Sequence, residues 1–267
     1  MLSPSQLEKF SRDGFVLGDQ ILSDSAVDEL RDEIDRIIRD RDRTDIPQPV
    51  LCHNMSGRPD AVLWQIVNIW QASDPFRRLA RNPQIAAAVS QLLADPDPRL
   101  WHDQIQYKVA GQGGVNMWHQ DTPYWPILAG GTQVTAWVAL DDVDEGNGCM
   151  SMVPGTQRWG NTIEFLQTIK TFDAMPPQWQ GRPVQVVTCP VKKGHVHFHH
   201  GLTWHGSHAN TSSRPRRALA LHFMSADTRY NPAGVHLMKR FVTSLAHQPL
   251  EGPPFLKIHA AACVAEK

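Results

Sequence analysis

Hydrophobic positions in the first third of the chain follow a helical period. Over residues 27–38, apolar residues recur every three or four positions with charged residues between them, which is typical of a helix that packs one face on a core. This spacing predicts a helix over residues 23–41. A Ser-Pro start predicts a shorter helix over residues 3–13, followed by a short strand over residues 15–17, and a further helical stretch is expected over residues 74–93.

The pattern changes after Pro98, where the apolar segments become short, alternating and rich in aromatic or β-branched residues, with turn residues between them. Strands are expected over residues 100–109, 117–121, 134–140, 150–153, 184–189, 195–199 and 218–224. Helices followed by strands, without βαβ alternation, predict a mainly β fold with flanking helices, namely a β-sandwich or jelly roll buttressed on one outer face. One domain is expected over residues 1–267, with a helical part at 1–98, a jelly-roll core at about 99–226 and a C-terminal extension at 227–267.

The composition argues against nucleic acid and anionic membranes as partners. Lys and Arg number 26 against 27 Asp and Glu, so no long-range field of one sign attracts nucleic acid or an anionic membrane. A content of 41% hydrophobic and 20% charged residues is typical of a soluble globular protein, and no signal peptide or transmembrane segment is recognisable. No CxxC pair occurs among Cys52, Cys149, Cys189 and Cys263, so reduced thiols in a cytoplasmic protein are expected.

Candidate metal ligands gather in the second half of the chain. His119 and Asp121 are two residues apart, and on a strand such side chains point to the same face. A third ligand is available among His195, His197, His199, His200, His205, His208 and His222. Two histidines and one carboxylate leave coordination positions open, which suits iron(II), whereas a structural zinc site closes its shell. For His197, His199 and His222, core filling or hydrogen bonding within a sheet is the alternative.

Five separated motifs resemble the phytanoyl-CoA dioxygenase family in both residues and order. They are His119-Gln120-Asp121, Trp137, Asn147-Gly148-Cys149 running to Val153-Pro154-Gly155-Thr156, His205-Gly206-Ser207, and Asn210 with Arg216. The resemblance extends from the segment at residues 10–16 to about Met224. It implies a double-stranded β-helix in which His119, Asp121 and His205 hold iron, with His208 as the nearby alternative to His205.

Arginine is the side chain expected to anchor 2-oxoglutarate, because its planar fork matches the two oxygens of the far carboxylate. On the strand that begins at Arg216, residues Arg216, Ala218, Ala220 and His222 share one face. This face is expected to border a cofactor cavity, and the opposite face, which starts at Arg217, is expected to pack against helices. Arg216 is therefore the candidate, whereas Arg214 and Arg217 are expected to be solvated. The resemblance further implies that Ser207, Trp137, Gln120 and Gln104 line or contact the co-substrate pocket.

The resemblance implies a non-haem iron(II) dioxygenase that uses 2-oxoglutarate and O2 to oxidise, by default to hydroxylate, a small organic molecule. The carboxylate of Asp121 argues against a halogenase, since related halogenases have a small residue there. A zinc hydrolase and a non-catalytic jelly-roll binding protein remain the alternatives, and a monomer or homodimer is expected. An apolar mouth or ordinary sheet packing would equally account for Tyr107, Met117, Trp118, Tyr124 and Trp125.

Overall fold

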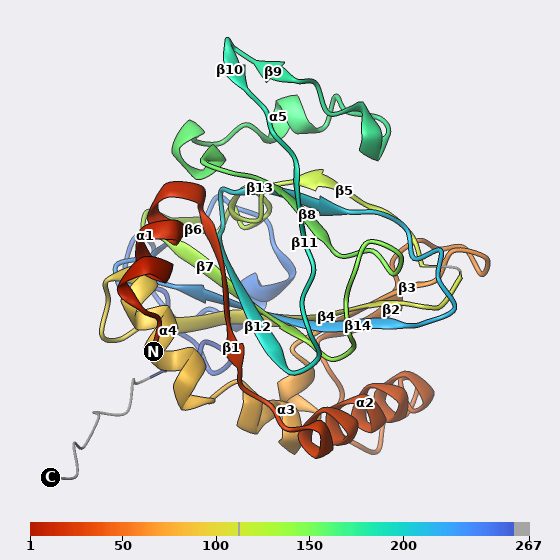
Figure 1. Ribbon diagram of the computed structural model, residues 1–267. Coiled ribbons are helices and arrows are strands. Elements are labelled where there is room, and N and C mark those ends of the chain that lie inside the picture. Colours follow the sequence, from red (N-terminus) through yellow and green to blue (C-terminus); the bar gives the residue numbers. More distant parts are fainter. Residues whose placement is uncertain (112, 259–267) are drawn as a thin grey trace, which may run out of the picture.

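Two antiparallel sheets face one another in the computed structural model, which describes residues 1–111 and 113–258 (Figure 1). The seven-stranded sheet has the order β1-β12-β7-β14-β4-β3-β2, and the four-stranded sheet has the order β11-β8-β13-β5. The larger sheet consists of β1 (Phe15–Gln20), β2 (Leu51–Asn54), β3 (Leu63–Val67), β4 (Arg99–Lys108), β7 (Gln133–Ala139), β12 (His195–His200) and β14 (Arg216–Met224). The smaller sheet consists of β5 (Asn116–His119), β8 (Met150–Val153), β11 (Val187–Cys189) and β13 (Trp204–Ser207). This arrangement confirms the predicted jelly roll.

Helices cover the outer face of the larger sheet (Figure 1). The α-helices are α1 (Pro4–Asp13), α2 (Asp24–Arg39), α3 (Asp74–Leu79), α4 (Pro83–Leu93) and the single turn α5 (Ile163–Leu166). The 3-10 turns are η1 (Ile69–Gln71), η2 (Thr122–Tyr124), η3 (Thr156–Trp159), η4 (Phe172–Ala174) and η5 (Leu237–Phe241). Ser3 and Ser23 cap α1 and α2 through their hydroxyl oxygens. The single helical stretch expected over residues 74–93 is divided, because Pro83 cannot donate to a preceding turn and Asn82 caps a new helix.

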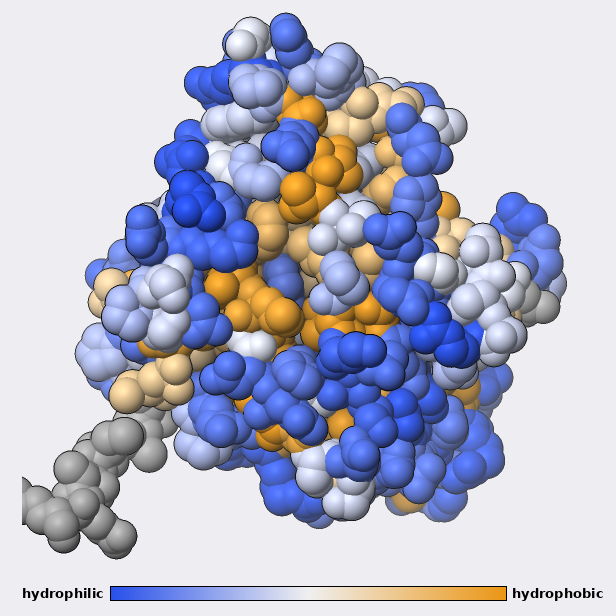
Figure 2. Space-filling model, in the orientation of Figure 1, coloured by the Kyte–Doolittle hydropathy of each residue, from blue (hydrophilic) through white to orange (hydrophobic). Residues whose placement is uncertain are grey.

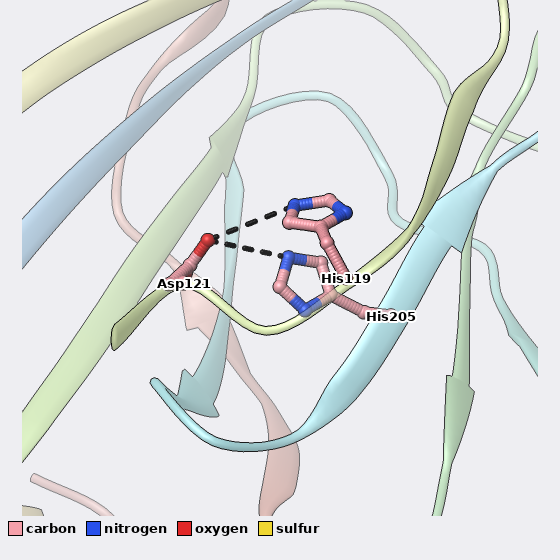
Figure 3. Close-up of side chains that lie close together, drawn as sticks. All are labelled: His119, Asp121 and His205. Carbon is pink, nitrogen blue, oxygen red and sulfur yellow. Dashed lines mark ion pairs between the residues drawn. The ribbon is translucent and has the colours of Figure 1, made fainter. Parts of the chain in front are cut away.

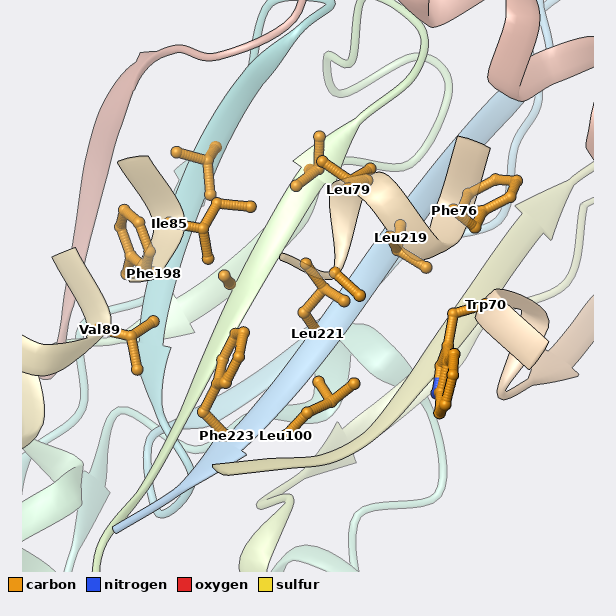
Figure 4. Close-up of a cluster of buried hydrophobic side chains, with 14 of the residues drawn as sticks. Trp70, Phe76, Leu79, Ile85, Val89, Leu100, Phe198, Leu219, Leu221 and Phe223 are labelled. Atoms are coloured by element: carbon orange, nitrogen blue, oxygen red, sulfur yellow. The ribbon is translucent and has the colours of Figure 1, made fainter. Parts of the chain in front are cut away.

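The largest apolar cluster lies between these helices and the outer face of β14 (Figure 4). Leu219, Leu221 and Phe223 are fully buried there, against side chains of α3 and α4 that include Phe76 and Ile85. Burying each such side chain stabilises the fold by about 1.5–3 kcal/mol. The predicted alternation of β14 is therefore confirmed, since its odd-numbered apolar residues pack beneath the helices.

The inner face of the larger sheet turns toward the smaller sheet, and small residues on it leave space. Ala218 and Ala220 of β14 lie beside Trp137, Met150 and Met152 in a second apolar cluster between the sheets. Because alanine fills little volume, the two layers do not close over the whole of this face. A cavity of about 760 Å³ opens between them.

Several strands were missed or misplaced from sequence. No strand was expected between α2 and α3, yet this segment contains β2 and β3, which extend the larger sheet beyond β4. The strand β13 was not expected at all, and β11 begins only at Val187 rather than at residue 184. These strands have only three to five residues each, so they carry little periodic signal of their own.

The chain after β14 returns across the end of the two sheets. Its short strand β15 (Arg229–Tyr230) pairs with β6 (Leu128–Ala129). Earlier in the chain, between α5 and β11, a small hairpin is formed by β9 (Gln178–Trp179) and β10 (Arg182–Pro183). Met238, Leu250 and Phe255 pack on Trp101 and Trp125 in a separate apolar cluster. The predicted extension at 227–267 is thus packed onto the sheets as far as the structure describes it, while Cys263 lies outside the described residues.

The face of the molecule seen in Figure 2 is largely polar. Hydrophilic residues cover most of the face shown in Figure 2, apart from a band of apolar residues near its middle. Among the described residues, no helix has both the length and the apolar character needed to cross a membrane.

Candidate metal centre and anion pocket

Two histidines of the smaller sheet lie directly opposite one another. His119 at the end of β5 pairs in register with His205 of β13, and their ring centroids are 4.1 Å apart. Asp121 lies just beyond β5, with its backbone in the helical region at the start of η2. Its Oδ1 is 3.7 Å from Nε2 of His119 and 3.5 Å from Nε2 of His205 (Figure 3). The expected convergence of the three side chains is therefore present, but a turn, and not strand alternation, brings Asp121 to the histidines.

Hydrogen bonds fix the tautomers of both histidines. Nδ1 of His119 lies 2.7 Å from the carbonyl of Met117, and Nδ1 of His205 lies 2.9 Å from the carbonyl of Thr203. A carbonyl only accepts, so each Nδ1 carries the proton and each Nε2 presents a lone pair. Burial lowers the pKa of His119 to about 4 and also lowers the pKa of His205. Both rings are thus neutral at neutral pH.

The second carboxylate oxygen of Asp121 is fixed by two hydrogen bonds. Its Oδ2 accepts hydrogen bonds from Thr135 Oγ1 at 3.0 Å and from His199 Nε2 at 3.2 Å. Thr135 has then used its only proton, so its oxygen accepts from Nδ1 of His222 at 2.8 Å. Burial alone would raise the pKa of Asp121, but the neighbouring histidines, His205 first, hold it well below its ordinary value. The carboxylate is therefore ionised and oriented with Oδ1 toward the two histidines.

These groups form a ligand set for one divalent cation. The donor atoms of His119, Asp121 and His205 all lie within 4.8 Å of one another. Two neutral imidazoles and one carboxylate on one side of a cavity fit iron(II) with open positions. His208, the alternative third ligand, instead pairs with Asp173 at 3.3 Å on the surface. The hydrogen bonds from Thr135 and His199 hold the carboxylate of Asp121 in orientation, as outer hydrogen bonds to metal ligands commonly do.

Arg216 lies on the inner face of β14 and borders the same cavity. It is 1% exposed, and it donates to Ser207 Oγ at 3.2 Å and to the carbonyl of Gly148 at 3.3 Å. Its guanidinium carbon lies 5.6 Å from the ring centroid of Trp137. Among the described residues it forms no ion pair with a carboxylate, and burial lowers its pKa to about 10. A buried cation without an anionic partner is costly, so this geometry favours binding of an anion.

A second buried cation lies beside Arg216 and was missed from sequence. Lys108 of β4 pairs in register with Arg216 and is 0% exposed. Its Nζ donates to Ser207 Oγ at 2.8 Å, to the Ser207 carbonyl at 3.2 Å and to the carbonyl of His208. Burial and the charge of Arg216 hold its pKa well below the ordinary value. The alternation of β4, which places Lys108 on the same face as Gln104 and Gln106, is the signal that could have found it.

Ser207 is hydrogen-bonded to both Lys108 and Arg216. Its Oγ accepts from both Lys108 and Arg216, which leaves its own proton to be donated elsewhere. No described group accepts that proton, and Ser207 borders the cavity. Its hydroxyl is therefore free to donate to an anion held by Arg216.

The remaining predicted pocket residues divide into two groups. Gln104 and Trp137 border the cavity, and Gln104 accepts a hydrogen bond from Gln65 at 2.9 Å. Gln120 is fully buried away from it, donating at 2.8 Å to the carbonyls of Gly160 and Leu202. The structure thus gives Gln120 bonds to neighbouring loops, and does not bring it to the cavity.

The expectation for the two flanking arginines was correct for one of them. Arg214 is half-exposed and pairs with Asp144 at 2.6 Å. Arg217 was wrongly expected to be solvated, since its side chain is 13% exposed and pairs with Asp141 at 2.9 Å. It also lies over the ring of Tyr107 on the outer face of the sheet. The apolar mouth therefore excludes Tyr107, whereas the cavity is bordered by Met117, Trp118, Tyr124 and Trp125.

Comparison with known proteins agrees with this geometry. The model of the family described as Phytanoyl-CoA dioxygenase matches residues 10–218, which is most of the chain. The chain belongs to the phytanoyl-CoA dioxygenase family. It is accordingly an oxidoreductase of the iron- and 2-oxoglutarate-dependent class, as the sequence motifs indicated.

Individual relatives are distant but cover most of the chain. The peroxisomal phytanoyl-CoA dioxygenase of Rattus norvegicus is 25% identical over 248 residues, covering 86% of this chain and 70% of the relative. An ectoine dioxygenase of Bordetella parapertussis is 28% identical over 247 residues, covering 86% and 78%. The solved structure of the non-heme alpha ketoglutarate dependent carbocyclase SnoK from nogalamycin biosynthesis matches with a TM-score of 0.77 at 25% identity, covering 96% of each chain. The proteins that this chain resembles are therefore named for quite different reactions.

Proposed function

We propose that this protein is a hydroxylase of a small organic molecule, in which His119, Asp121 and His205 hold iron(II) and Arg216 anchors 2-oxoglutarate. The observation that carries the proposal is Arg216, a buried guanidinium without an anionic partner among the described residues, in the cavity that the three ligands also border. Its fork and the free proton of Ser207 suit the far carboxylate of a dicarboxylate.

Each residue has a defined task in this proposal. Iron(II) supplies the activation of dioxygen, coupled to oxidation of 2-oxoglutarate to succinate and carbon dioxide. The neutral histidines present Nε2 to the cation, and Thr135 and His199 keep one oxygen of Asp121 turned away from it. Arg216 and Ser207 orient the co-substrate, with Trp137 beside the guanidinium. The protein thus contributes positioning and exclusion of water, while the cofactor supplies the chemistry.

The competing functions account for fewer of these features. A zinc hydrolase would use the three ligands but has no need of the buried guanidinium of Arg216 in the adjoining pocket, or of Lys108 buried next to it. A non-catalytic jelly-roll binding protein would need neither the ligand set nor the support behind Asp121. A halogenase requires a coordination position for chloride where this chain has the carboxylate of Asp121. Oxidation with 2-oxoglutarate therefore explains the most observations.

The test is iron-dependent turnover of 2-oxoglutarate. Protein reconstituted with iron(II) should release succinate above the background of buffer with iron, and the zinc-loaded protein should release none. His119→Ala, Asp121→Ala and His205→Ala should each abolish release, because losing one of three ligands removes geometry and charge together.

His208→Ala is the matched control, because His208 lies close to His205 in sequence but pairs with Asp173 on the surface. It should keep both iron binding and succinate release. If His208→Ala lost iron while His205→Ala retained it, the assignment of the distal ligand would be wrong. Absence of succinate from the iron-loaded wild-type protein would contradict the proposed function itself.

A further inference from the structure

The segment 160–174 borders the cavity without belonging to either sheet. It contains α5 and η4 and no strand. In Figure 1, α5 lies on the side of the smaller sheet that faces away from the larger one, and β5 is the edge strand past which the segment reaches the cavity. Two buried apolar and two exposed polar residues of the segment border the cavity: Leu166, Ile169, Gln167 and Lys170. A molecule that enters the cavity therefore meets this segment.

Gln120 makes most of the hydrogen bonds that hold the segment in place. Apart from a surface ion pair of Asp173, five hydrogen bonds tie residues 160–174 to the rest of the described chain, and three of them involve Gln120. Its amide oxygen accepts from the backbone N–H of Thr162 at 2.8 Å and from the Thr162 hydroxyl at 3.2 Å. Its amide nitrogen donates to the carbonyl of Gly160 at 2.8 Å.

The amide of Gln120 has no hydrogen-bonding capacity left for a ligand. Its nitrogen donates the second proton to the carbonyl of Leu202 at 2.8 Å, in the turn between β12 and β13. Backbone carbonyls only accept and a backbone N–H only donates, so these partners fix which end of the amide is oxygen. The side chain is 0% exposed. Gln120 therefore joins the turn that carries the metal ligands to two other loops.

Two tryptophans supply the remaining hydrogen bonds to the segment. The indole N–H of Trp204 donates to the hydroxyl of Thr162 at 2.6 Å, and that of Trp118 donates to the carbonyl of Phe172 at 2.8 Å. The rings of Trp118 and Phe172 also stack, with centroids 4.8 Å apart. Between these two attachment points, residues 163–171 form hydrogen bonds only with near neighbours in sequence. Apart from apolar packing, the position of this stretch therefore depends chiefly on Gln120.

We propose that Gln120 is a positioning residue for entry into the cavity, which holds the segment 160–174 in place and contacts neither the metal nor the co-substrate. Gln120 stands between His119 and Asp121 in the chain, so the turn that carries the metal ligands also fixes one wall beside them. The nature of the molecules that pass this wall rests on the proposed function. The positioning role itself follows from the hydrogen bonds.

The first test is hydrogen exchange of the Thr162 amide, followed by NMR in the presence of 2-oxoglutarate with diamagnetic zinc(II) in place of iron. Gln120→Leu should exchange this amide at least about tenfold faster than the wild type, because it removes three neutral hydrogen bonds from the segment. Amides of β14 should keep their protection. Gln120→Glu, which keeps an oxygen for Thr162 but donates at most one proton, should lie between the two. Unchanged exchange in Gln120→Leu would overturn the proposal.

The second test measures entry into the cavity. The bulky chelator ferrozine is added in excess, without oxygen, to protein that holds iron(II) and 2-oxoglutarate, and the rate of iron removal is followed by absorbance. Gln120→Leu should lose iron several-fold faster, because the chelator reaches the metal past a loosened wall, while its affinity for 2-oxoglutarate stays that of the wild type. A side chain that bound the co-substrate would instead lower this affinity. Weaker binding of 2-oxoglutarate, or iron removal at the wild-type rate, would refute the positioning role.

Gln91→Leu is the matched control. The amide of Gln91 also holds a backbone segment, since it accepts from the N–H of Leu2 at 2.9 Å and donates to the Leu2 carbonyl at 3.3 Å, but it does not border the cavity. This variant should be less stable in urea yet keep wild-type exchange at Thr162 and wild-type iron removal. Equal acceleration of iron removal in both variants would mean that lost stability, and not positioning, is the cause.

Thr162→Val is the milder variant if Gln120→Leu does not fold. It removes the hydroxyl that bonds to both Gln120 and Trp204 and leaves the backbone N–H in place. Iron removal by ferrozine should be faster than in the wild type, and an unchanged rate would count against the proposal.

Succinate release by the wild-type protein is measured in parallel and separates the two proposals. Faster exchange and faster iron removal in Gln120→Leu, without iron-dependent succinate release by the wild type, would contradict the proposed function and leave the positioning role standing. Succinate release with unchanged exchange in Gln120→Leu would contradict only the positioning role.

Discussion

Replacing Arg216 with alanine is the sharpest perturbation of the co-substrate pocket. Truncating one partner of a buried, hydrogen-bonded charge pair typically costs about 2–5 kcal/mol. Lys108 is fully buried, shares Ser207 with Arg216 and remains in the variant, so part of the positive charge stays next to the bound carboxylate. We therefore expect the lower part of that range, about 2–3 kcal/mol, or a 30- to 150-fold higher requirement for 2-oxoglutarate.

Two further variants distinguish charge from geometry. Arg216→Lys should recover only part of the loss, because an ammonium group cannot offer the parallel fork of a guanidinium. Lys108→Met combined with Arg216→Ala should raise the requirement well beyond either single change, since no buried cation then remains beside Ser207. Arg214→Ala should have little effect, because that side chain is half-exposed and pairs with Asp144.

The assay is a titration of 2-oxoglutarate with iron saturating, read as succinate released, together with a separate measurement of iron affinity. Iron affinity in the absence of co-substrate should be nearly the same in all these variants, because neither cation is a ligand. The reasoning would fail if Arg216→Ala and Arg214→Ala behaved alike, or if Arg216→Ala weakened iron binding as much as co-substrate binding.

Three other outcomes are expected. Thr135→Val should weaken iron binding by about 10- to 100-fold in a metal titration, because Oδ2 of Asp121 loses its hydroxyl donor, and Thr135→Ser should restore it. Asp121→Gly should abolish hydroxylation without yielding efficient chlorination, since an opened coordination position brings no chloride pocket; a chlorinated main product in mass spectrometry would refute this. Burial lowers the pKa of His200 to about 4, so below pH 6.5 the unfolded chain binds a proton that the folded chain does not. Urea unfolding of the wild-type protein should therefore show about 2 kcal/mol of stability lost through this group by pH 5, and His200→Gln should remove that loss.

The sequence predicted the fold where periodicity was strong. The helix at 23–41 and the two faces of β14 follow directly from the spacing of apolar residues, and both are found. Short strands such as β2 and β13 carry too few alternating positions to be recognised, although β13 holds His205. The division of the helical stretch at Pro83 could have been predicted, because a proline after an Asn cap commonly begins a new helix.

The candidate site shows a similar division. The residues that stand in motifs, such as His119 and Arg216, could be selected from sequence, and the structure brings them to one cavity. The alternation of β4 could have placed Lys108 on the inner face, but its burial beside Arg216 is visible only in the structure. The contribution of Thr135 to the orientation of Asp121 likewise depends on a tertiary contact between β7 and the turn after β5.

The rim of the cavity is supplied by connections, whereas its base is supplied by strands. Met55 follows β2, Val115 precedes β5, Tyr124 belongs to η2 and Leu237 belongs to η5. Four separate connecting segments therefore meet at the opening of the cavity. Loops tolerate insertion and replacement far better than paired strands do. Natural variation can therefore reshape what enters the cavity while the ligands and the anion anchor stay in place, which makes this scaffold well suited to acquiring new substrates by exchange of loops.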